Sequence, residues 1–402
     1  LHEGLLSSGI NSKLLCLTHP YKQFANAFEY TAPVPNRSER IKNKAKRILH
    51  EFYLRPGIKS KESKLLENKI EGFDIFSFPD SPFNLTQHPL YKEADVINLH
   101  WTAGFLDYPS FFKDNKKIIV WTLHDMNPFT GGCHYSSGCE KFKNNCRNCP
   151  QLQGTINPDL SSEILNIKIN SINPNLNLTI VSLSEWMMNL SRESLLFRNF
   201  THTLIVNGVN TNVFKPLDVG HSRKLLSLPM DKKIILFIAQ NLNSKRKGFQ
   251  FLLNALDGLS ERKDTVLCVV GNHQIKIAAK NVIDLGIINE DRLLSAVYSA
   301  SDLFIIPSVE DNLPNTVVES LLCGTPVVGF HVGGIPDLIQ NGKNGFLTKD
   351  ISSEQLLKSI NDFLDVSSSF DRRMISEEAR SKYSIDKQVK EYISLYQRLL
   401  SA

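Results

Sequence analysis

The sequence lacks the glycine patterns that mark two common classes of nucleotide-binding site. None of its 21 glycines forms a Gly-x-Gly pair, and no Walker loop occurs, so neither the dinucleotide fingerprint nor a phosphate loop is present. No Asp-x-Asp pair occurs, which argues against transferases that hold a divalent cation through such a pair. The absence of a Gly-x-Ser-x-Gly elbow argues against an α/β-hydrolase.

Long hydrophobic runs are missing as well. No apolar run approaches the ~20 residues that a membrane helix needs, and no signal-peptide pattern is present. These absences predict a cytoplasmic protein. The sequence begins at Leu1 without Met, and no strand with a glycine-rich turn opens it, so we expect the N-terminal strand of the first domain to be missing.

Length and turn chemistry predict two domains. A chain of 402 residues is too long for one ordinary core. Asn207-Gly208 and then Lys215-Pro216 combine turn residues with little periodicity, which is typical of a crossing between domains. We expect an N-terminal domain over 1–206, a C-terminal domain over 207–380 and a terminal helix over 381–402.

The most informative stretch runs from 301 to 347. Its apolar residues 303–306 end at Pro307, which suits a buried parallel strand, and residues 316–323 have the pattern of an amphipathic helix. A second strand begins at Val327. Ligands of open α/β sheets bind at the loops that follow such strands.

The N-terminus of the predicted helix and two acidic residues in this stretch suit a ligand that carries both phosphate and hydroxyl groups. Asn315 and Thr316 lie in the first helical turn, where free N–H groups and the helix dipole favour a phosphate. Asp311 lies in the loop, and Glu319 follows eight residues later on the helix. Such a pair can flank one ligand, because carboxylates accept hydrogen bonds from sugar hydroxyls.

The stretch resembles the nucleotide-sugar site of retaining glycosyltransferases of the GT-B fold, family 4. That family has an acid, seven residues, Glu, and then Gly-x-Pro-Val-Val, and Asp311 to Glu319 with 324–328 match this signature. Glu310 lies one residue before Asp311, so either acid is a candidate for the donor sugar. The resemblance implies two Rossmann-like doubly wound domains facing a cleft. It also implies that the helix over 381–402 returns to the N-terminal domain.

A basic turn supplies candidate ligands for the diphosphate of a nucleotide-sugar donor. An apolar strand over 233–239 is followed by three consecutive cations, Lys245 to Lys247, and a glycine. Cations at a strand-to-helix junction can neutralise a diphosphate. In the resembled family an Arg and a Lys six residues apart bind it; Lys247 matches the Lys, whereas Asn241 holds the Arg position. Arg246 or Lys245 is therefore expected to supply the second charge.

Two histidines end predicted strands of the first domain. The strands over 96–101 and 117–123 lead to His100 and to His124-Asp125, at the catalytic edge of such a sheet. A lone histidine at a strand end is otherwise a packing or capping residue. The resemblance implies that His124 lies beside the reacting sugar, with His100 and Asp125 on the acceptor side.

Four of the seven cysteines fall within 130–152, namely Cys133, Cys139, Cys146 and Cys149. Only the last pair has the C-x-x-C spacing of zinc knuckles. In a reducing cytosol they suit a structural tetrahedral zinc site, with His134 as a substitute ligand. Two disulfides in an oxidising compartment and simple buried thiols are the alternatives. No catalytic metal is expected, because four protein ligands leave no open position.

Positive charge is concentrated early in the chain. Residues 1–70 contain thirteen Lys or Arg and six Glu, a net charge of +7 against +5 for the whole chain. Residues 37–55 have the pattern of a basic amphipathic helix, which can rest on anionic lipid headgroups or form a solvated face. Nucleic acid is not expected, since no aromatic-interleaved basic platform accompanies the charge.

Together these features predict a glycosyltransferase that moves a sugar from a nucleotide diphosphate sugar to a glycan or lipid-linked acceptor, with retention. The expected setting is bacterial polysaccharide biosynthesis, in the cytoplasm or peripherally on the inner face of the plasma membrane. The alternatives are a GT-B relative of other chemistry, such as a sugar-nucleotide 2-epimerase or a phosphorylase, and a non-catalytic nucleotide-sugar-binding protein.

Overall fold

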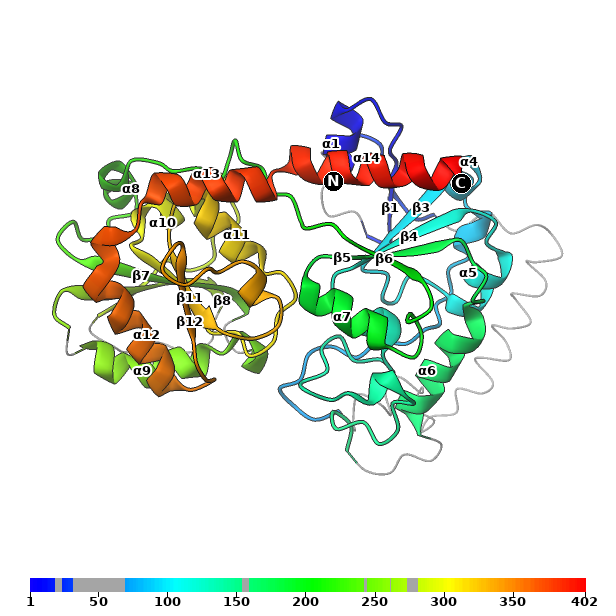
Figure 1. The fold of residues 1–402 in the computed structure, drawn as a ribbon, viewed down its shortest axis with the longest axis horizontal. Coiled ribbons are helices and arrows are strands. Elements are labelled where there is room, and N and C mark those ends of the chain that lie inside the picture. Colours follow the sequence, from blue (N-terminus) through cyan, green and yellow to red (C-terminus); the bar gives the residue numbers. More distant parts are fainter. Residues whose placement is uncertain (19–23, 32–68, 154–158, 242–243, 261, 273–280) are drawn as a thin grey trace.

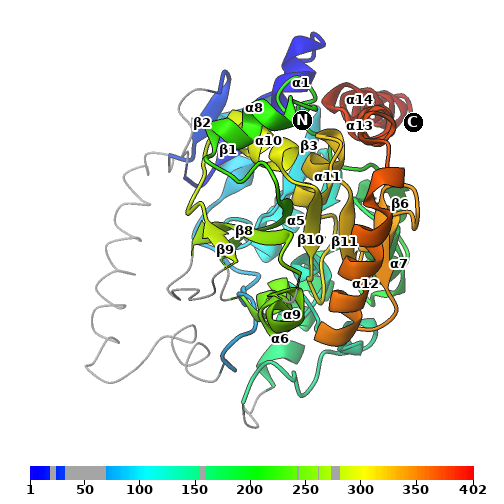
Figure 2. The same cartoon turned by 90° about the vertical axis from the view of Figure 1, so that its left-hand side faces the viewer.

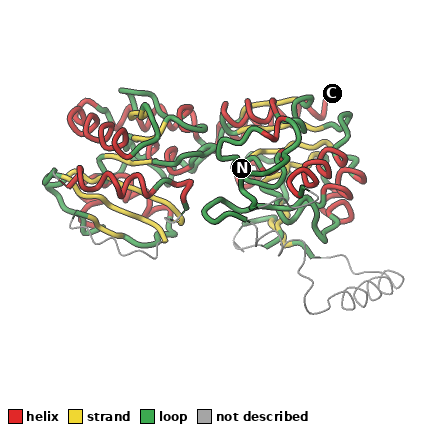
Figure 3. The backbone as a smooth tube through the Cα atoms, turned by 90° about the horizontal axis from the view of Figure 1, so that it is seen from below, coloured by secondary structure: helices red, strands yellow, loops and turns green. Residues whose placement is uncertain are grey.

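The computed structural model describes residues 1–18, 24–31, 69–153, 159–241, 244–260, 262–272 and 281–402. The described residues form two lobes, each built on a parallel sheet with helices packed around it (Figure 1). The lobes are also distinct when seen from below (Figure 3). The predicted α/β class is confirmed, whereas the predicted basic helix over 37–55 lies outside the described residues.

The first lobe is built on four parallel strands in the order β3-β4-β5-β6. These strands are β3 (Val96–His100), β4 (Ile118–Leu123), β5 (Leu178–Ser182) and β6 (Thr201–Leu204). Successive residues of β4 serve two cores, because Trp121 packs between Phe112 and Phe197 on one face while Val120 packs on the other. Both faces are covered, which explains why five of the six residues of β4 are apolar.

Short elements complete this lobe. Its helices are α1 (His2–Ser7), α4 (Pro89–Glu93), α5 (Tyr108–Asp114), α6 (Leu160–Ser171) and α7 (Glu185–Glu193). Its 3-10 turns are η1 (Leu85–Gln87), η2 (Asn127–Phe129) and η3 (Lys141–Lys143). A separate parallel pair is formed by β1 (Leu14–Cys16) and β2 (Ala27–Glu29).

The second lobe is built on six parallel strands in the order β12-β11-β10-β7-β8-β9. They are β7 (Lys233–Asn241), β8 (Thr265–Asn272), β9 (Val282–Asp284), β10 (Leu303–Ile306), β11 (Val327–Phe330) and β12 (Gly345–Thr348). From β7 the chain adds β8 and β9 on one side, and from β10 it adds β11 and β12 on the other side. The strand order therefore reverses between β7 and β10, and this switch point is where a doubly wound sheet opens to a ligand.

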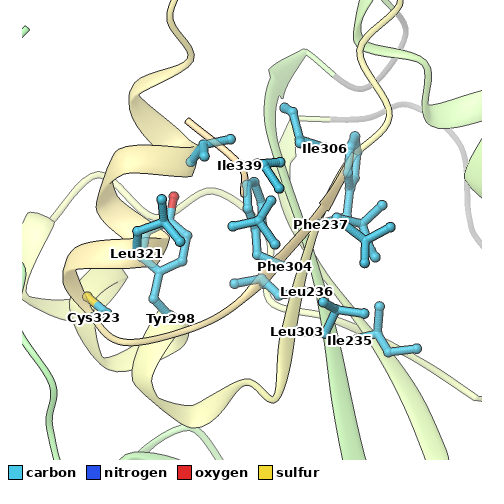
Figure 4. Close-up of a cluster of buried hydrophobic side chains, with 14 of the residues drawn as sticks. Ile235, Leu236, Phe237, Tyr298, Leu303, Phe304, Ile306, Leu321, Cys323 and Ile339 are labelled. Atoms are coloured by element: carbon cyan, nitrogen blue, oxygen red, sulfur yellow. The ribbon is translucent and has the colours of Figure 1, made fainter. Parts of the chain in front are cut away.

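Helices cover both faces of the six-stranded sheet. They are α8 (Val219–Leu225), α9 (Phe249–Ser260), α10 (Asp291–Ala300), α11 (Asn315–Leu322), α12 (Ser353–Val366) and α13 (Arg372–Tyr383), with 3-10 turns η4 (Lys245–Lys247), η5 (Ile335–Asp337) and η6 (Ser367–Ser369). Figure 4 shows the core beneath them, where Tyr298 of α10 packs edge-on against Phe304 of β10 with ring centroids 5.7 Å apart. This packing fixes the strands whose carboxyl ends carry the candidate site.

The last helix crosses between the lobes. After α13 on the second lobe, α14 (Ile385–Ser401) runs over the first, beside α1 (Figures 1 and 2). Tyr392 is fully buried there, with its hydroxyl 2.8 Å from Thr122 Oγ1, and Asn98 donates to the Tyr396 hydroxyl at 2.7 Å. The chain also crosses from the first lobe to the second near Val209. The two crossings lie side by side, since the Val209 N–H donates to the Tyr383 carbonyl at 2.8 Å.

None of the helices in the described ranges is both long enough and apolar enough to cross a membrane.

Candidate functional site

The basic turn and the acidic loop meet at the switch point of the second lobe. The turn η4 follows β7, and the acidic loop follows β10. Gly248 closes the turn in the left-handed region, with φ +68°, and a Cβ there would lie 1.8 Å from the Pro307 carbonyl oxygen. The Val309 N–H also donates to the Arg246 carbonyl at 2.9 Å. The glycine that follows the three cations thus permits direct backbone contact between the two loops.

Asp311 faces the cations of the turn. Its Oδ2 lies 2.7 Å from Lys247 Nζ and 3.4 Å from Arg246 Nη1, and its side chain is 8% exposed. Burial opposes ionisation of this carboxyl, but Lys247 and Arg246 outweigh burial and hold the pKa of Asp311 below its ordinary value. Asp311 is therefore an anion at neutral pH, held between two cations at the edge of the sheet.

Glu310 points the other way, toward the first lobe. Its carboxylate accepts a hydrogen bond from the Ser137 N–H at 2.9 Å and one from the Ser136 hydroxyl at 3.4 Å. Burial raises the pKa of Glu310 above its ordinary value, against the opposing effect of these donors. Of the two acids that the sequence left open, Asp311 lies with the cations and Glu310 links the lobes.

Arg246 supplies the second cation beside Asp311. Its guanidinium lies over the Tyr135 ring, 4.0 Å from the centroid, and forms an ion pair with Asp74. Both partners belong to the first lobe, so Arg246 joins the lobes as well as lying beside Lys247. Lys245 instead reaches the Glu71 carbonyl, at 3.4 Å.

The helix that follows the acidic loop presents its N-terminus and Glu319. Asn315 and Thr316 begin α11, so their N–H groups are among those without intrahelical partners. The Asn315 side chain also accepts a hydrogen bond from Asn207 Nδ2 at 3.3 Å. Glu319 accepts one from the Tyr298 hydroxyl at 2.9 Å, and burial raises the pKa of Glu319 to about 7.

The histidines lie together at the carboxyl edge of the first sheet. His100 Nδ1 is 2.9 Å from His124 Nε2, so one ring donates to the other. Burial lowers the pKa of His124, which leaves its imidazole neutral at neutral pH. Asp125 is buried, and its Oδ2 lies 2.7 Å from His134 Nδ1. Asp125 therefore holds His134 in place instead of pointing into open space.

Asn312 joins the acidic loop to the histidine loop. Its amide donates to the carbonyls of Leu123 at 3.0 Å and His124 at 3.1 Å, and its oxygen accepts from the Ser184 hydroxyl at 2.7 Å. The side chain is only 2% exposed. These hydrogen bonds hold the loop that contains Asp311 against the backbone of His124, whose imidazole is the candidate catalytic group.

The four cysteines of the 130–152 segment line one cavity. Cys133, Cys139, Cys146 and Cys149 all contribute to it, and every cysteine of the chain is a free thiol. No group of three or more His, Cys, Asp or Glu side chains in the described ranges is spaced to hold a metal ion. Both ring nitrogens of His134 are engaged, by Asp125 and by the Ser77 hydroxyl at 2.8 Å, so neither nitrogen is left for a metal ion in this arrangement.

Several residues of the site escape sequence reasoning. Asp74 and Tyr135 hold Arg246, yet they lie in segments without helical or strand periodicity. Asn312 is next to Asp311, but nothing in its local pattern indicates that it bonds across the lobes. Tyr298 shows only as an apolar position of α10, although its hydroxyl reaches Glu319.

Comparison with known proteins gives a family match and consistent relatives. Residues 232–365 match the family described as glycosyl transferases group 1. A protein named as a colanic acid biosynthesis glycosyl transferase, WcaC of Escherichia coli strain K12, is 25% identical over 329 residues, or 78% of each chain. The D-inositol 3-phosphate glycosyltransferase of Thermobispora bispora is 29% identical over 181 residues, covering 40% of this chain and 42% of that protein.

Solved structures share the fold across both lobes. A glycosyltransferase from Rickettsia africae aligns with a TM-score of 0.64 at 16% identity, covering 99% of this chain and 93% of that one. HepE of Anabaena, solved in complex with UDP and glucose, aligns with a TM-score of 0.55 at 20% identity, covering 76% and 79%. These likenesses confirm the predicted GT-B fold.

Proposed function

We propose that the chain transfers a sugar from a nucleotide diphosphate sugar to a glycan or lipid-linked acceptor, with retention, because residues 232–365 match the glycosyl transferases of group 1 and the chain has the GT-B fold. The similarity to WcaC, named for colanic acid biosynthesis, supports bacterial surface polysaccharide as the product. The basic segment 37–55 supports work at the inner face of the plasma membrane.

The observation that carries this proposal is the meeting of cations, acid and helix N-terminus at the switch point of the second sheet. Lys247 and Arg246 bind the donor diphosphate, helped by the first-turn N–H groups of α11. These groups stabilise the charge that develops on the leaving phosphate. In the described arrangement Asp311 occupies both cations, so the diphosphate displaces a carboxylate when it binds.

The remaining groups orient the two substrates. Asp311, once released from the cations, accepts hydrogen bonds from the donor sugar hydroxyls, and Glu319 accepts them from the ribose. His124 lies near the reacting carbon, with its imidazole oriented by His100. The HepE structure with UDP and glucose supports a donor of this class.

A panel of UDP-, GDP- and ADP-sugars tests the proposal. We expect one of them to raise the melting temperature and then to donate its sugar to a glycan acceptor. An epimerised donor, or a sugar phosphate formed from inorganic phosphate, would indicate the rival chemistries. Stabilisation without any turnover would indicate a binding protein.

The raised pKa of Glu319 predicts a pH-dependent stability. Since burial raises this pKa to about 7, the folded state favours the protonated acid. The stabilisation from this group is fully present below the unfolded pKa of ~4.3 and is lost as the pH rises through 7. The melting temperature of unliganded Glu319→Gln should therefore decrease less between pH 5 and pH 8 than that of the native chain. Glu354→Gln, at an exposed position, should keep the native slope; equal slopes in all three proteins would contradict the prediction.

We also propose that the cysteine cavity takes a structural zinc ion. Between Gly132 and Asn148 the backbone enters the left-handed region at the non-glycine residues Ser137, Cys146 and Asn148, and the regular structure there is one short 3-10 turn, η3. A segment with so little regular structure gains stability from a cross-link. The Gly131 N–H already donates to Cys146 Sγ at 3.3 Å, although the thiols must converge further to coordinate an ion.

A buried lysine favours zinc thiolates over neutral thiols. Lys168 is fully buried, and its ammonium donates to the carbonyls of Asn127 and Thr130, with no carboxylate among its ion-pair partners in the described ranges. Burial lowers the pKa of Lys168 to about 8, and the thiolate forms of Cys133 and Cys146 and the carboxylate of Asp125 would oppose that shift. Because a buried cation needs a nearby anion, a cluster of thiolates around Zn²⁺ would stabilise it.

Elemental analysis of the purified protein tests the zinc site. We expect about one zinc per chain, lost in Cys146→Ser/Cys149→Ser together with a lower melting temperature. The matched control is Cys268→Ser, which alters a buried thiol of the second sheet and should retain the metal. A zinc-free, reduced protein of unchanged stability would end this proposal.

A further inference from the structure

Trp101, at the edge of the first sheet, combines a strained backbone conformation with an exposed side chain. Trp101 follows β3 directly, and its backbone lies in the left-handed region at φ 39°. A non-glycine residue rarely adopts that conformation, because its side chain makes it strained. The indole is nevertheless 56% exposed, whereas Trp121 is fully buried in the core. Core packing therefore does not explain why Trp101 is held in this conformation.

The ring of Trp101 borders a cavity beside the candidate catalytic histidine. Besides Trp101, the residues that line the cavity include Thr102, Thr122, His124, Asn127 and His134. The indole lies 6.1 Å from the His134 ring, between centroids, and His134 is fixed by Asp125 and Ser77. An apolar face thus stands next to hydroxyl, amide and imidazole groups.

This combination suits a neutral ring with one apolar face and several hydroxyls. A pyranose offers C–H groups on its face, which pack on an aromatic ring, and hydroxyls at its edge, which bond polar side chains. The lining contains neither Lys nor Arg, so it offers no cation for a phosphate group. The Thr122, Asp125 and His134 side chains of the lining are already hydrogen-bonded within the protein. This leaves the Thr102 hydroxyl and the remaining polar atoms of the His124 and Asn127 side chains to meet the ligand. A lipid chain has no group that bonds them.

We propose that Trp101 is the stacking platform for a sugar ring of the acceptor, so that the acceptor is a saccharide and not a bare lipid phosphate. This inference rests on the proposed function, and it narrows that function to transfer onto an existing glycan. Trp101 contacts the acceptor from the first lobe, while the donor is held by the second. The acceptor ring lies next to His124, where the sugar is transferred.

Intrinsic fluorescence tests the platform without any donor. The chain has three tryptophans, so methyl glycosides of glucose, galactose, mannose and fucose can be titrated against the native protein, Trp101→Phe and Trp186→Phe. We expect a saturable change with at least one glycoside, lost in Trp101→Phe and kept in Trp186→Phe, whose site is a partly buried position of α7. A change that persists in Trp101→Phe, or no change with any glycoside, would overturn the proposal.

Kinetics separates this inference from the proposed function. In Trp101→Ala we expect kcat/KM for the glycan acceptor to fall about tenfold, with the donor KM and the donor-induced thermal shift unchanged, while Trp101→Phe retains most of the activity. Transfer that is indifferent to both substitutions would refute the platform and leave the glycosyltransferase intact. Failure of every nucleotide sugar to stabilise the native chain would instead refute the proposed function.

Discussion

Replacing Lys247 by alanine should lower the rate of sugar transfer by about a hundredfold or more. Its ammonium lies 2.7 Å from Asp311 Oδ2, at the switch point where the diphosphate is expected. Loss of one preorganised group that stabilises leaving-group charge costs about 10²–10³ in kcat. The measurement is steady-state transfer with the nucleotide sugar that stabilises the native chain, with kcat and donor KM determined separately.

The matched control for this substitution is Lys358→Ala. That lysine lies on α12 of the same lobe, its side chain is 61% exposed, and it forms an ion pair with Asp362 at 2.5 Å. The Lys358→Ala substitution removes one positive charge from the same lobe, and we expect its rate of sugar transfer to stay within twofold of the native rate. Native kcat in Lys247→Ala, or an equal loss in Lys358→Ala, would mean that the basic turn does not bind the diphosphate. Lys247→Arg should keep part of the activity, because it keeps the charge.

The second large effect is expected for Asn312→Ala. This buried amide makes three hydrogen bonds that link the lobes, two to carbonyls of the histidine loop and one from Ser184. Removing it leaves those groups unpaired, at about 1–3 kcal/mol for each that stays buried. We expect kcat/KM to fall at least tenfold, and small-angle scattering to report a larger radius of gyration as the lobes separate.

Asn344→Ala provides the comparison for Asn312. Asn344 is also bonded at both ends of its amide, accepting from the Gln340 N–H at 2.7 Å and donating to the Leu338 carbonyl at 3.0 Å, but entirely within the second lobe. Its loss should lower the melting temperature and leave kcat/KM and the radius of gyration unchanged. If Asn312→Ala did no more than Asn344→Ala, the interlobe contact would have no part in activity.

Local pattern was sufficient to predict the fold class. The apolar runs that became β7, β10 and β11 are buried on both faces, and strands of that kind carry the same signal wherever they lie in a parallel sheet. The order of the strands is another matter. It depends on which runs pair across long connections, and neither composition nor periodicity encodes that pairing. The resemblance implies a doubly wound sheet, and the structure gives the order of its strands.

The candidate site was accessible to sequence reasoning only where its residues sit at fixed offsets from a strand or helix. Lys247 and Asp311 do, and the structure brings them into contact; their roles toward a donor stay predictions. Glu310 and Asp311 are adjacent and alike, so only the path of the loop shows that one meets the cations and the other the first lobe. Asp74 and Tyr135 meet Arg246 through tertiary packing alone.

The path of the chain through the two crossings limits how this protein can be recombined with its relatives. Since α14 covers one face of the first sheet with Tyr392 while α13 remains on the second lobe, a hybrid that takes its second lobe from another protein must switch sequence twice. The two exchange points lie side by side, near Val209 and Ser384. A hybrid joined only at the first exchange point would present a foreign helix to the native Thr122 and Asn98, and its first lobe would fold poorly.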